Sequence, residues 1–168
     1  MKSAALDAPP GPGGATDADQ RAAASLFWSG ATAAILKPKD QTGQFNLTVS
    51  SGGGCSVRGT GTYTGTLSGA NVNGSGVMNV ALTAAFNQCT LFDGNVITAP
   101  VVTFTGTVAI TADARAATQV RVVATALTVN GRVCDGGIDI TVLASSPSAP
   151  ATGSGTACGV IRTYTLSP

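Results

Sequence analysis

Two stretches of the chain decide the fold: SGVMNVALTAAFN, residues 75–87, and VVTFTGTVAITA, residues 101–112. In both, apolar side chains alternate with mainly polar ones. Successive side chains of a strand point to opposite faces, so each stretch predicts a strand with one apolar, half-buried face and one threonine-rich face in water. The residues on the predicted apolar faces are Met78, Val80, Leu82, Ala84 and Phe86 in the first stretch and Val102, Phe104, Val108 and Ile110 in the second.

The same alternation, with turn signals between the runs, predicts further strands over 45–49, 57–68, 123–129, 132–142 and within 156–166. Asn73-Gly74 and Asn130-Gly131 suit two-residue hairpin loops because Asn-Gly tolerates positive φ angles. A loop at Asn130-Gly131 pairs Val129 with Arg132 and extends to the pairs Leu127–Cys134, Thr125–Gly136 and Val123–Ile138. The predicted fold is all-β, an antiparallel sandwich or small barrel of about seven strands.

A short repeat links two of these strands. TYTGTL at residues 62–67 matches TFTGTV at residues 103–108. Two six-residue matches are too little for a solenoid, and we interpret them as two strands that meet the same packing requirement. Glycines on the apolar faces favour tight curvature or close approach of another element. They are Gly59, Gly61, Gly65 and Gly106.

The region before the strands predicts one helix, about residues 17–36. Thr16 is a suitable N-cap, and Asp17 and Asp19 would face the positive end of the helix dipole. We expect this helix to pack on the sheet through Leu26, Phe27 and Trp28. An exposed docking surface is the alternative role for these three side chains. The uncharged stretch is too short to cross a bilayer.

Composition excludes several kinds of function. Charged residues make up 10% of the chain, the net charge is +1, and the arginines are scattered, so there is no basic surface for nucleic acid. The chain has no histidine, which removes Ser-His and Cys-His nucleophile pairs. All eight acidic residues are aspartates. We interpret Asp93 and Asp135 as turn residues and Asp139 as a residue on the outward face of its strand. We expect no enzyme activity, no cofactor and no metal.

The four cysteines predict two disulfides and an oxidising compartment. Zinc binding by the four cysteines is the alternative interpretation, but the chain has no Cys-x-x-Cys motif. A hairpin at Asn73-Gly74 brings Cys89 opposite Arg58, close to Cys55. A turn at 146–148 brings Cys158 opposite Gly136, within reach of Cys134. We therefore predict the bridges Cys55–Cys89 and Cys134–Cys158.

The first residues lack the apolar region of a signal peptide. We expect that a signal or lipoprotein leader was removed upstream of residue 1, which leaves a lipid anchor there as an option. Residues 1–15, rich in proline and glycine, read as a flexible tether, and residues 16–168 as a single β domain. The expected location is the periplasm, the cell surface or the extracellular space.

A family resemblance rests on three short motifs: a glycine-rich stretch that ends at Cys55, then Phe86-Asn87-Gln88-Cys89, then Ala157-Cys158-Gly159. This layout resembles uncharacterised secreted β-rich proteins and lipoproteins of bacteria. Residues 102–108, VTFTGTV, are also similar to the strands of chaperone-assembled fimbrial subunits, and Tyr164 is similar to the tyrosine near their C-terminus. That tyrosine is typically penultimate, whereas four residues follow Tyr164 here. Neither resemblance implies an activity.

The leading functional hypothesis is a non-enzymatic, exported structural or interaction module of the bacterial cell envelope, with an unidentified protein or envelope component as partner. Its oligomeric state is open. The alternative is a small β-barrel carrier of an apolar ligand, because small residues on the core faces could leave unfilled volume inside a barrel.

Overall fold

The computed structural model describes residues 18–20, 43–52, 55, 58–73, 75–90, 94–110, 118–144 and 151–166. These residues form ten strands in one antiparallel sheet. The strands are β1 Gly43–Gly52, β2 Thr60–Val72, β3 Ser75–Thr90, β4 Val96–Ile110, β5 Thr118–Ala124, β6 Thr128–Val129, β7 Arg132–Val133, β8 Ile138–Ala144, β9 Ala151–Ala157 and β10 Val160–Leu166. The predicted all-β, antiparallel class is confirmed.

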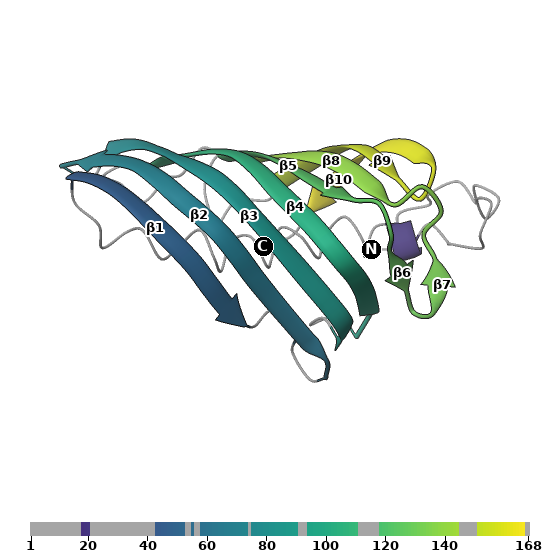
Figure 1. Ribbon diagram of the computed structural model, residues 1–168. Coiled ribbons are helices and arrows are strands. Elements are labelled where there is room, and N and C mark those ends of the chain that lie inside the picture. Colours follow the sequence, from purple (N-terminus) through teal and green to yellow (C-terminus); the bar gives the residue numbers. More distant parts are fainter. Residues whose placement is uncertain are drawn as a thin grey trace.

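The order of hydrogen-bonded strands is β1-β2-β3-β4-β5-β8-β9-β10, with the small β6–β7 hairpin attached to β4. Figure 1 shows that β1 to β4 are long, tilted and curved. No pairing joins β1 to β10 among the described residues, so the sheet is open. The predicted closed barrel is therefore wrong, and one sheet replaces the predicted sandwich. The sandwich prediction fails because successive strands of the main path keep extending one sheet, and the barrel prediction fails because no pairing among the described residues joins the two edge strands.

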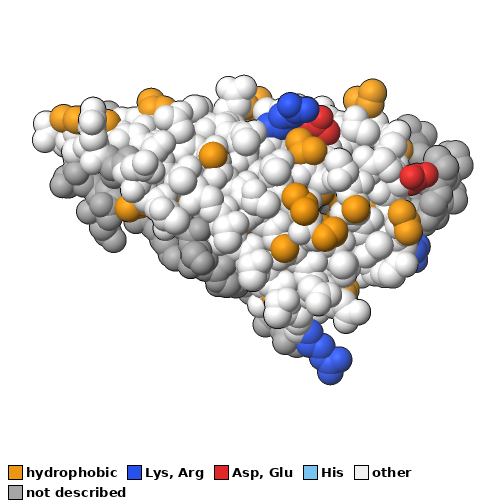
Figure 2. Space-filling model, viewed as in Figure 1, with side chains coloured by type: hydrophobic (Ala, Val, Ile, Leu, Met, Phe, Trp, Pro, Cys, Tyr) orange, Lys and Arg blue, Asp and Glu red, His pale blue; other side chains and the backbone are white. Residues whose placement is uncertain are grey.

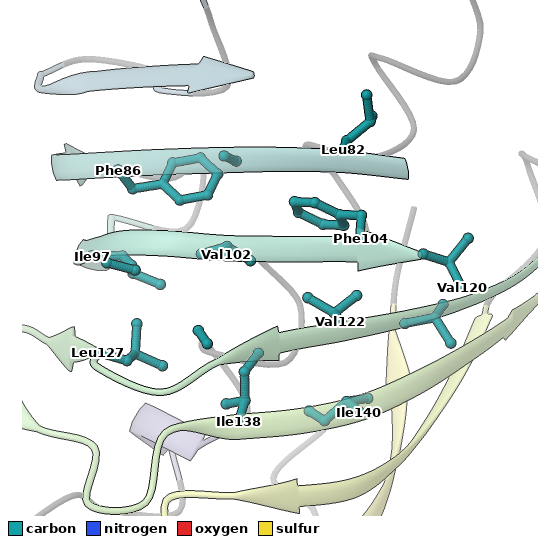
Figure 3. Packing of buried hydrophobic residues seen from close by; sticks show 14 of the residues in the cluster. Leu82, Phe86, Ile97, Val102, Phe104, Val120, Val122, Leu127, Ile138 and Ile140 are labelled. Atoms are coloured by element: carbon teal, nitrogen blue, oxygen red, sulfur yellow. The ribbon is translucent and has the colours of Figure 1, made fainter. Parts of the chain in front are cut away.

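The first half of the sheet follows the predicted alternation. Val72 pairs with Ser75, which leaves residues 73–74 as a two-residue loop, and Asn73 has the positive φ of 52° that such a loop requires. The predicted apolar residues of β3 are buried, and so are Val102, Phe104 and Val108 of β4, so each strand has one face in the core. Figure 3 shows several of these side chains packed together, among them Phe86 and Phe104, with Val122 of the neighbouring strand β5 beside them.

A bulge near the end of β3 changes which face the side chains occupy. The register between β3 and β4 shifts between Ala84 and Phe86 and again between Phe86 and Cys89, and Gln88 has a φ of 46°. The backbone N–H of Gln88 donates to the Thr98 hydroxyl at 3.1 Å. The extra residue moves Cys89 to the buried side, where it can bond to Cys55.

The TYTGTL and TFTGTV repeat marks two bends of the sheet. Gly65 and Gly106 have φ angles of 140° and 157°. A Cβ at Gly65 would lie 2.1 Å from the carbonyl oxygen of Ala81, and one at Gly106 would lie 2.0 Å from that of Gln119. Only glycine fits such a close approach between neighbouring strands. Of the two expected roles of the core-face glycines, close approach of another element is confirmed at these two positions, and the element is the neighbouring strand.

The second half differs from the predicted register by one residue. The Asn130-Gly131 loop is present, and Val129 pairs with Arg132 as predicted. Beyond it, Val123 pairs with Asp139, not with Ile138. Gly136 and Gly137, with φ angles of 82° and 64°, form a corner that the predicted straight hairpin lacks. The slip buries Val122 and leaves Val123 only half-buried.

The predicted last strand is two strands. β9 and β10 form a hairpin whose two-residue loop is Cys158-Gly159, with φ angles of 50° and 81°. Because of this hairpin and the split of the 123–142 region, the sheet has ten strands where about seven were predicted.

Only Ala18, Asp19 and Gln20 of the predicted helix are described, and they are helical. The rest of the span 17–36, with Leu26, Phe27 and Trp28, lies outside the described residues, as does the predicted tether 1–15. Packing of these three side chains on the sheet stays a prediction.

Candidate interaction surface

The outer face of the sheet carries mainly polar side chains, arranged in rows across the strands. Neighbouring strands are in register, so outward residues of one strand lie beside outward residues of the next. One row crosses all eight strands of the main path: Thr48, Thr66, Ala81, Thr105, Arg121, Thr141, Ser154 and Thr163. These residues are exposed or half-buried. The sequence predicted threonine-rich outer faces strand by strand, and the register joins them into one surface.

Two further rows flank this one. The first contains Thr64, Thr83, Thr103, Val123, Asp139, Thr156 and Ile161, and the second contains Asn46, Ser68, Asn79, Thr107, Gln119, Leu143, Thr152 and Thr165. No aromatic side chain belongs to any of the three rows. Figure 2 shows one face of the molecule as mainly polar and uncharged, with one place where a basic and an acidic group meet, a few other charged groups toward the edges, and several apolar groups near the middle.

An ion pair lies within these rows. Arg121 of β5 donates to Asp139 of β8 from Nε at 2.8 Å and from Nη2 at 2.6 Å. The hydrogen bond from Arg121 lowers the pKa of Asp139, and the same bond raises the pKa of Arg121. Asp139 is exposed, as the sequence predicted for an outward residue. Solvent screens such a pair, so it orients the two side chains more than it stabilises the fold.

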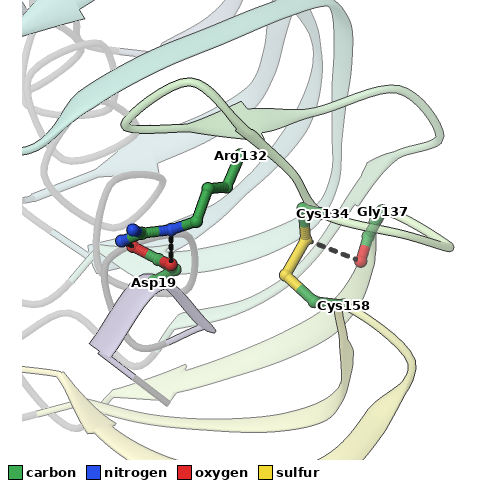
Figure 4. Close-up of a disulfide and its surroundings, with 5 residues drawn as sticks. All are labelled: Asp19, Arg132, Cys134, Gly137 and Cys158. Carbon is green, nitrogen blue, oxygen red and sulfur yellow. Dashed lines mark hydrogen bonds and ion pairs between the residues drawn. A yellow bond between two sulfur atoms is a disulfide. The ribbon is translucent and has the colours of Figure 1, made fainter. Parts of the chain in front are cut away.

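A second ion pair joins the N-terminal segment to the sheet. Arg132 of β7 donates to both carboxylate oxygens of Asp19, at 2.7 and 2.9 Å, and only 2% of the Asp19 side chain is exposed. These bonds raise the pKa of Arg132. The sequence suggested helix capping for Asp19 and did not reveal this partner. A bidentate pair fixes both side chains, so residues 18–20 are held against the β6–β7 hairpin (Figure 4).

Asn130 extends this corner into β4. Its N–H donates to the carbonyl of Val96 at 2.8 Å, and its side-chain oxygen accepts from the N–H of Val96 at 2.9 Å. Its amide also donates to Asn95 at 2.8 Å. The sequence identified Asn130 as a turn residue only. Its side-chain contacts attach the hairpin to the sheet.

The two disulfides have the predicted pairing. Cys55 bonds to Cys89, and Cys134 bonds to Cys158. The N–H of Cys158 donates to the carbonyl of Gly137 at 2.8 Å, so Cys158 lies one residue away from its predicted position opposite Gly136. Figure 4 shows the second bridge close to the Asp19–Arg132 pair. The bridge joins the corner before β8 to the β9–β10 loop.

Tyr63 is one of two buried tyrosines of the core, together with Tyr164. Its ring is edge-on to Phe86, with centroids 5.7 Å apart, and burial raises its pKa to about 12. Its hydroxyl is buried without a hydrogen-bond partner. An unsatisfied buried hydroxyl costs free energy, so it marks a position that a ligand acceptor could occupy.

The remaining predicted features are only partly described. Asp93 and Asp17 lie outside the described residues. Asp135-Gly136 forms the predicted turn, with the N–H of Gly137 donating to the carbonyl of Cys134 at 2.9 Å. Within the described ranges no three His, Cys, Asp or Glu side chains form a group that could hold a metal ion. No helix in the described part of the chain is long and apolar enough to span a membrane.

The fold and surface define an all-β protein with one open antiparallel sheet, a polar outer face and two disulfides. Comparisons of the chain with known protein families, with curated proteins and with solved structures give no match.

Proposed function

We propose that the protein is a non-enzymatic interaction module that is exported and acts at the bacterial cell envelope. The observation that carries the proposal is the set of three mainly polar rows that cross one face of the sheet from strand to strand, interrupted by four apolar residues: Ala81, Val123, Leu143 and Ile161. A face of this kind offers many hydroxyl and amide groups to a broad polar partner. It offers no concentrated charge.

Two further observations support export and a structural role. Both disulfides join residues of the β domain to each other, and disulfides persist in oxidising compartments. The motifs around Cys55, Cys89 and Cys158 that resemble secreted β-rich proteins of bacteria all surround these bridges. The absence of histidine from the sequence argues against the commonest general base in catalysis.

The test is co-sedimentation of the purified protein with isolated bacterial envelope fragments. We expect wild-type protein in the pellet. The double variant Thr64→Lys/Thr105→Lys, which adds two charges to the outer face, should stay in the supernatant. The matched control, Thr125→Lys/Ala126→Lys, adds the same charge at exposed residues outside the strands and should still sediment. Failure of wild-type protein to sediment, or equal loss in both variants, would contradict the proposal.

The second candidate is a carrier of an apolar ligand, and the unpaired hydroxyl of Tyr63 favours it. The open sheet removes the barrel interior of the original hypothesis, so the ligand would lie on the inner face beside Tyr63. Native mass spectrometry of protein purified without detergent should then show a bound molecule, and Tyr63→Phe should weaken its retention. If no ligand is found and Tyr63→Phe is neutral or stabilising, this candidate is rejected.

A further inference from the structure

The open sheet has two edges, β1 and β10. Within the described residues, β1 pairs only with β2 and β10 pairs only with β9. An edge strand presents a row of unpaired backbone N–H and C=O groups, which is a template for another strand. The two edges can therefore be compared as binding sites.

Hairpin geometry assigns which residues of β1 direct their backbone groups outward. The residues that flank a two-residue loop, here Val72 and Ser75, form a hydrogen-bonded pair, and such pairs alternate along an antiparallel ladder. Odd-numbered residues of β2 therefore bond to β1, and Leu67 does so with Leu47. The even-numbered residues of β1, Asn46 and Thr48 among them, turn their N–H and C=O groups toward the free edge.

The β10 edge carries a protecting device that β1 lacks. Arg162 of β10 is on the inner-face side of the strand, in the same cross-strand row as Ile140 and Gly155, and an inward-pointing charge on an edge strand discourages further pairing. β10 is also short, with seven residues. β1 has ten residues, GQFNLTVSSG, with no charge and no proline. Its pairing with β2 is continuous, without a bulge.

The core is also incomplete at the β1 edge. Leu47 packs against the core cluster but is only partly buried, whereas the core residue opposite it in β2, Leu67, is 0% exposed. A strand added beside β1 would cover the exposed part of Leu47. Backbone geometry and packing therefore both indicate that this edge accepts another strand.

We propose that β1 pairs antiparallel with β1 of a second copy of this chain, about a two-fold axis at Thr48. This inference rests on the proposed function and names a partner for the interaction module. With Thr48 opposite its own copy, Asn46 faces Ser50, and all outward-directed backbone groups meet in register. Strands of this length exchange about ten backbone hydrogen bonds. The uncharged sequence of β1 places no like charges across the axis, and the polar rows continue from one copy into the other.

The primary test is the mass in solution by light scattering over a range of concentrations. We expect wild-type protein to form a dimer, twice the chain mass of 16.4 kDa, when its concentration approaches about 100 μM. Thr48→Pro removes one outward-directed N–H and spares the bonds to β2, so it should weaken the dimer at least about tenfold.

Thr163→Pro is the matched control. Thr163 is the other end of the row that begins at Thr48, and the same hairpin argument, applied to the Cys158-Gly159 loop, directs its N–H to the free edge of β10. This variant should dimerise like wild-type protein. A wild-type monomer at all concentrations, or a dimer that Thr163→Pro weakens and Thr48→Pro does not, would overturn the proposal.

Hydrogen exchange on wild-type protein keeps the proposal testable if Thr48→Pro does not fold. The amides of Asn46, Thr48 and Ser50 should be protected at high concentration and exchange quickly on dilution, while that of Leu47 stays protected throughout. Protection of the even-numbered amides at every concentration would show that the edge pairs within its own chain, which also overturns the proposal. These results do not depend on envelope binding, so the proposed function can fail or survive separately.

Discussion

The two halves of the sheet are built differently. β2, β3 and β4 have 13, 16 and 15 residues and share long registers, interrupted only near the ends of β3 and β4. β5, β8, β9 and β10 have seven residues each, and residues with positive φ angles form the corner before β8 and the loop between β9 and β10. The long half is held by repeated cross-strand contacts. Each half also has one disulfide, Cys55–Cys89 in the long half and Cys134–Cys158 in the short half, and the Asp19–Arg132 pair lies close to the second one (Figure 4).

The largest expected loss of stability comes from a glycine substitution in the long half. It tests whether the close approach of strands at this glycine is needed for the stability of that half. In Gly106→Ala the new Cβ would lie 2.0 Å from the Gln119 carbonyl oxygen at a φ of 157°, so the two strands must separate. We expect a loss of about 3 kcal/mol or more in the free energy of unfolding, measured in urea.

Gly94→Ala is the control for this substitution. Gly94 also has a positive φ, 84°, but its added Cβ meets nothing within 4 Å, so we expect a loss of about 1 kcal/mol. Equal losses at Gly94 and Gly106 would mean that backbone conformation alone, and not the close approach of strands, selects glycine in the repeat.

The next largest loss of stability is expected when one of the two disulfides is removed. The bridges span 34 and 24 residues, so chain entropy predicts similar losses of roughly 2–4 kcal/mol when either pair is replaced by alanine. The halves should differ in where the loss appears. Without Cys134–Cys158, hydrogen exchange should rise in β8, β9 and β10 and stay slow in β3 and β4. Uniform acceleration over the whole sheet would show that the two halves unfold as one unit.

The same contrast explains what the sequence could predict. In the long half, alternation over a dozen residues identifies both the strand and its buried face, because a slip of one residue would bury the threonines. Asn73 then fixes the hairpin. In the short half, Gly136 and Gly137 add a corner that shifts the pairing by one, and alternation over seven residues is too short to reveal it.

Two other features could not be predicted from the sequence, because local patterns do not record them. A non-glycine residue rarely adopts the positive φ angle that Cys158 has in the β9–β10 loop. The sequence pattern therefore predicts one strand where the structure has a hairpin. The Asp19–Arg132 contact joins residues 113 positions apart, and no local signal records it. The disulfide pairing could be predicted because each bridge depends on the position of only one turn. An error of one residue in the strand register still leaves the two sulfur atoms close enough to bond.

A smaller effect tests how the N-terminal segment is attached to the short half. Asp19→Asn keeps the shape of a buried side chain but removes the charge that Arg132 contacts. Losing charge-assisted hydrogen bonds from this buried carboxylate should cost about 1 kcal/mol or more in unfolding free energy. Asp139→Asn, at an exposed carboxylate with a similar arginine contact, is the control and should cost less. The reverse order would mean that residues 18–20 contribute little to the stability of the sheet.

The smallest effect concerns the exposed pair Arg121–Asp139, which joins β5 to β8 within the short half. The folded-state pKa of Asp139 lies below its ordinary value, so the stability that this pair contributes is present above the unfolded pKa and is lost as pH falls through the folded pKa. In Arg121→Gln the pKa of Asp139, followed by NMR of the carboxyl carbon, should rise toward the ordinary value of about 3.9. Unfolding at pH 7 should change little, because water screens the exposed charges. A large loss of stability at neutral pH would show instead that the short half depends on its surface charges as much as on its disulfide.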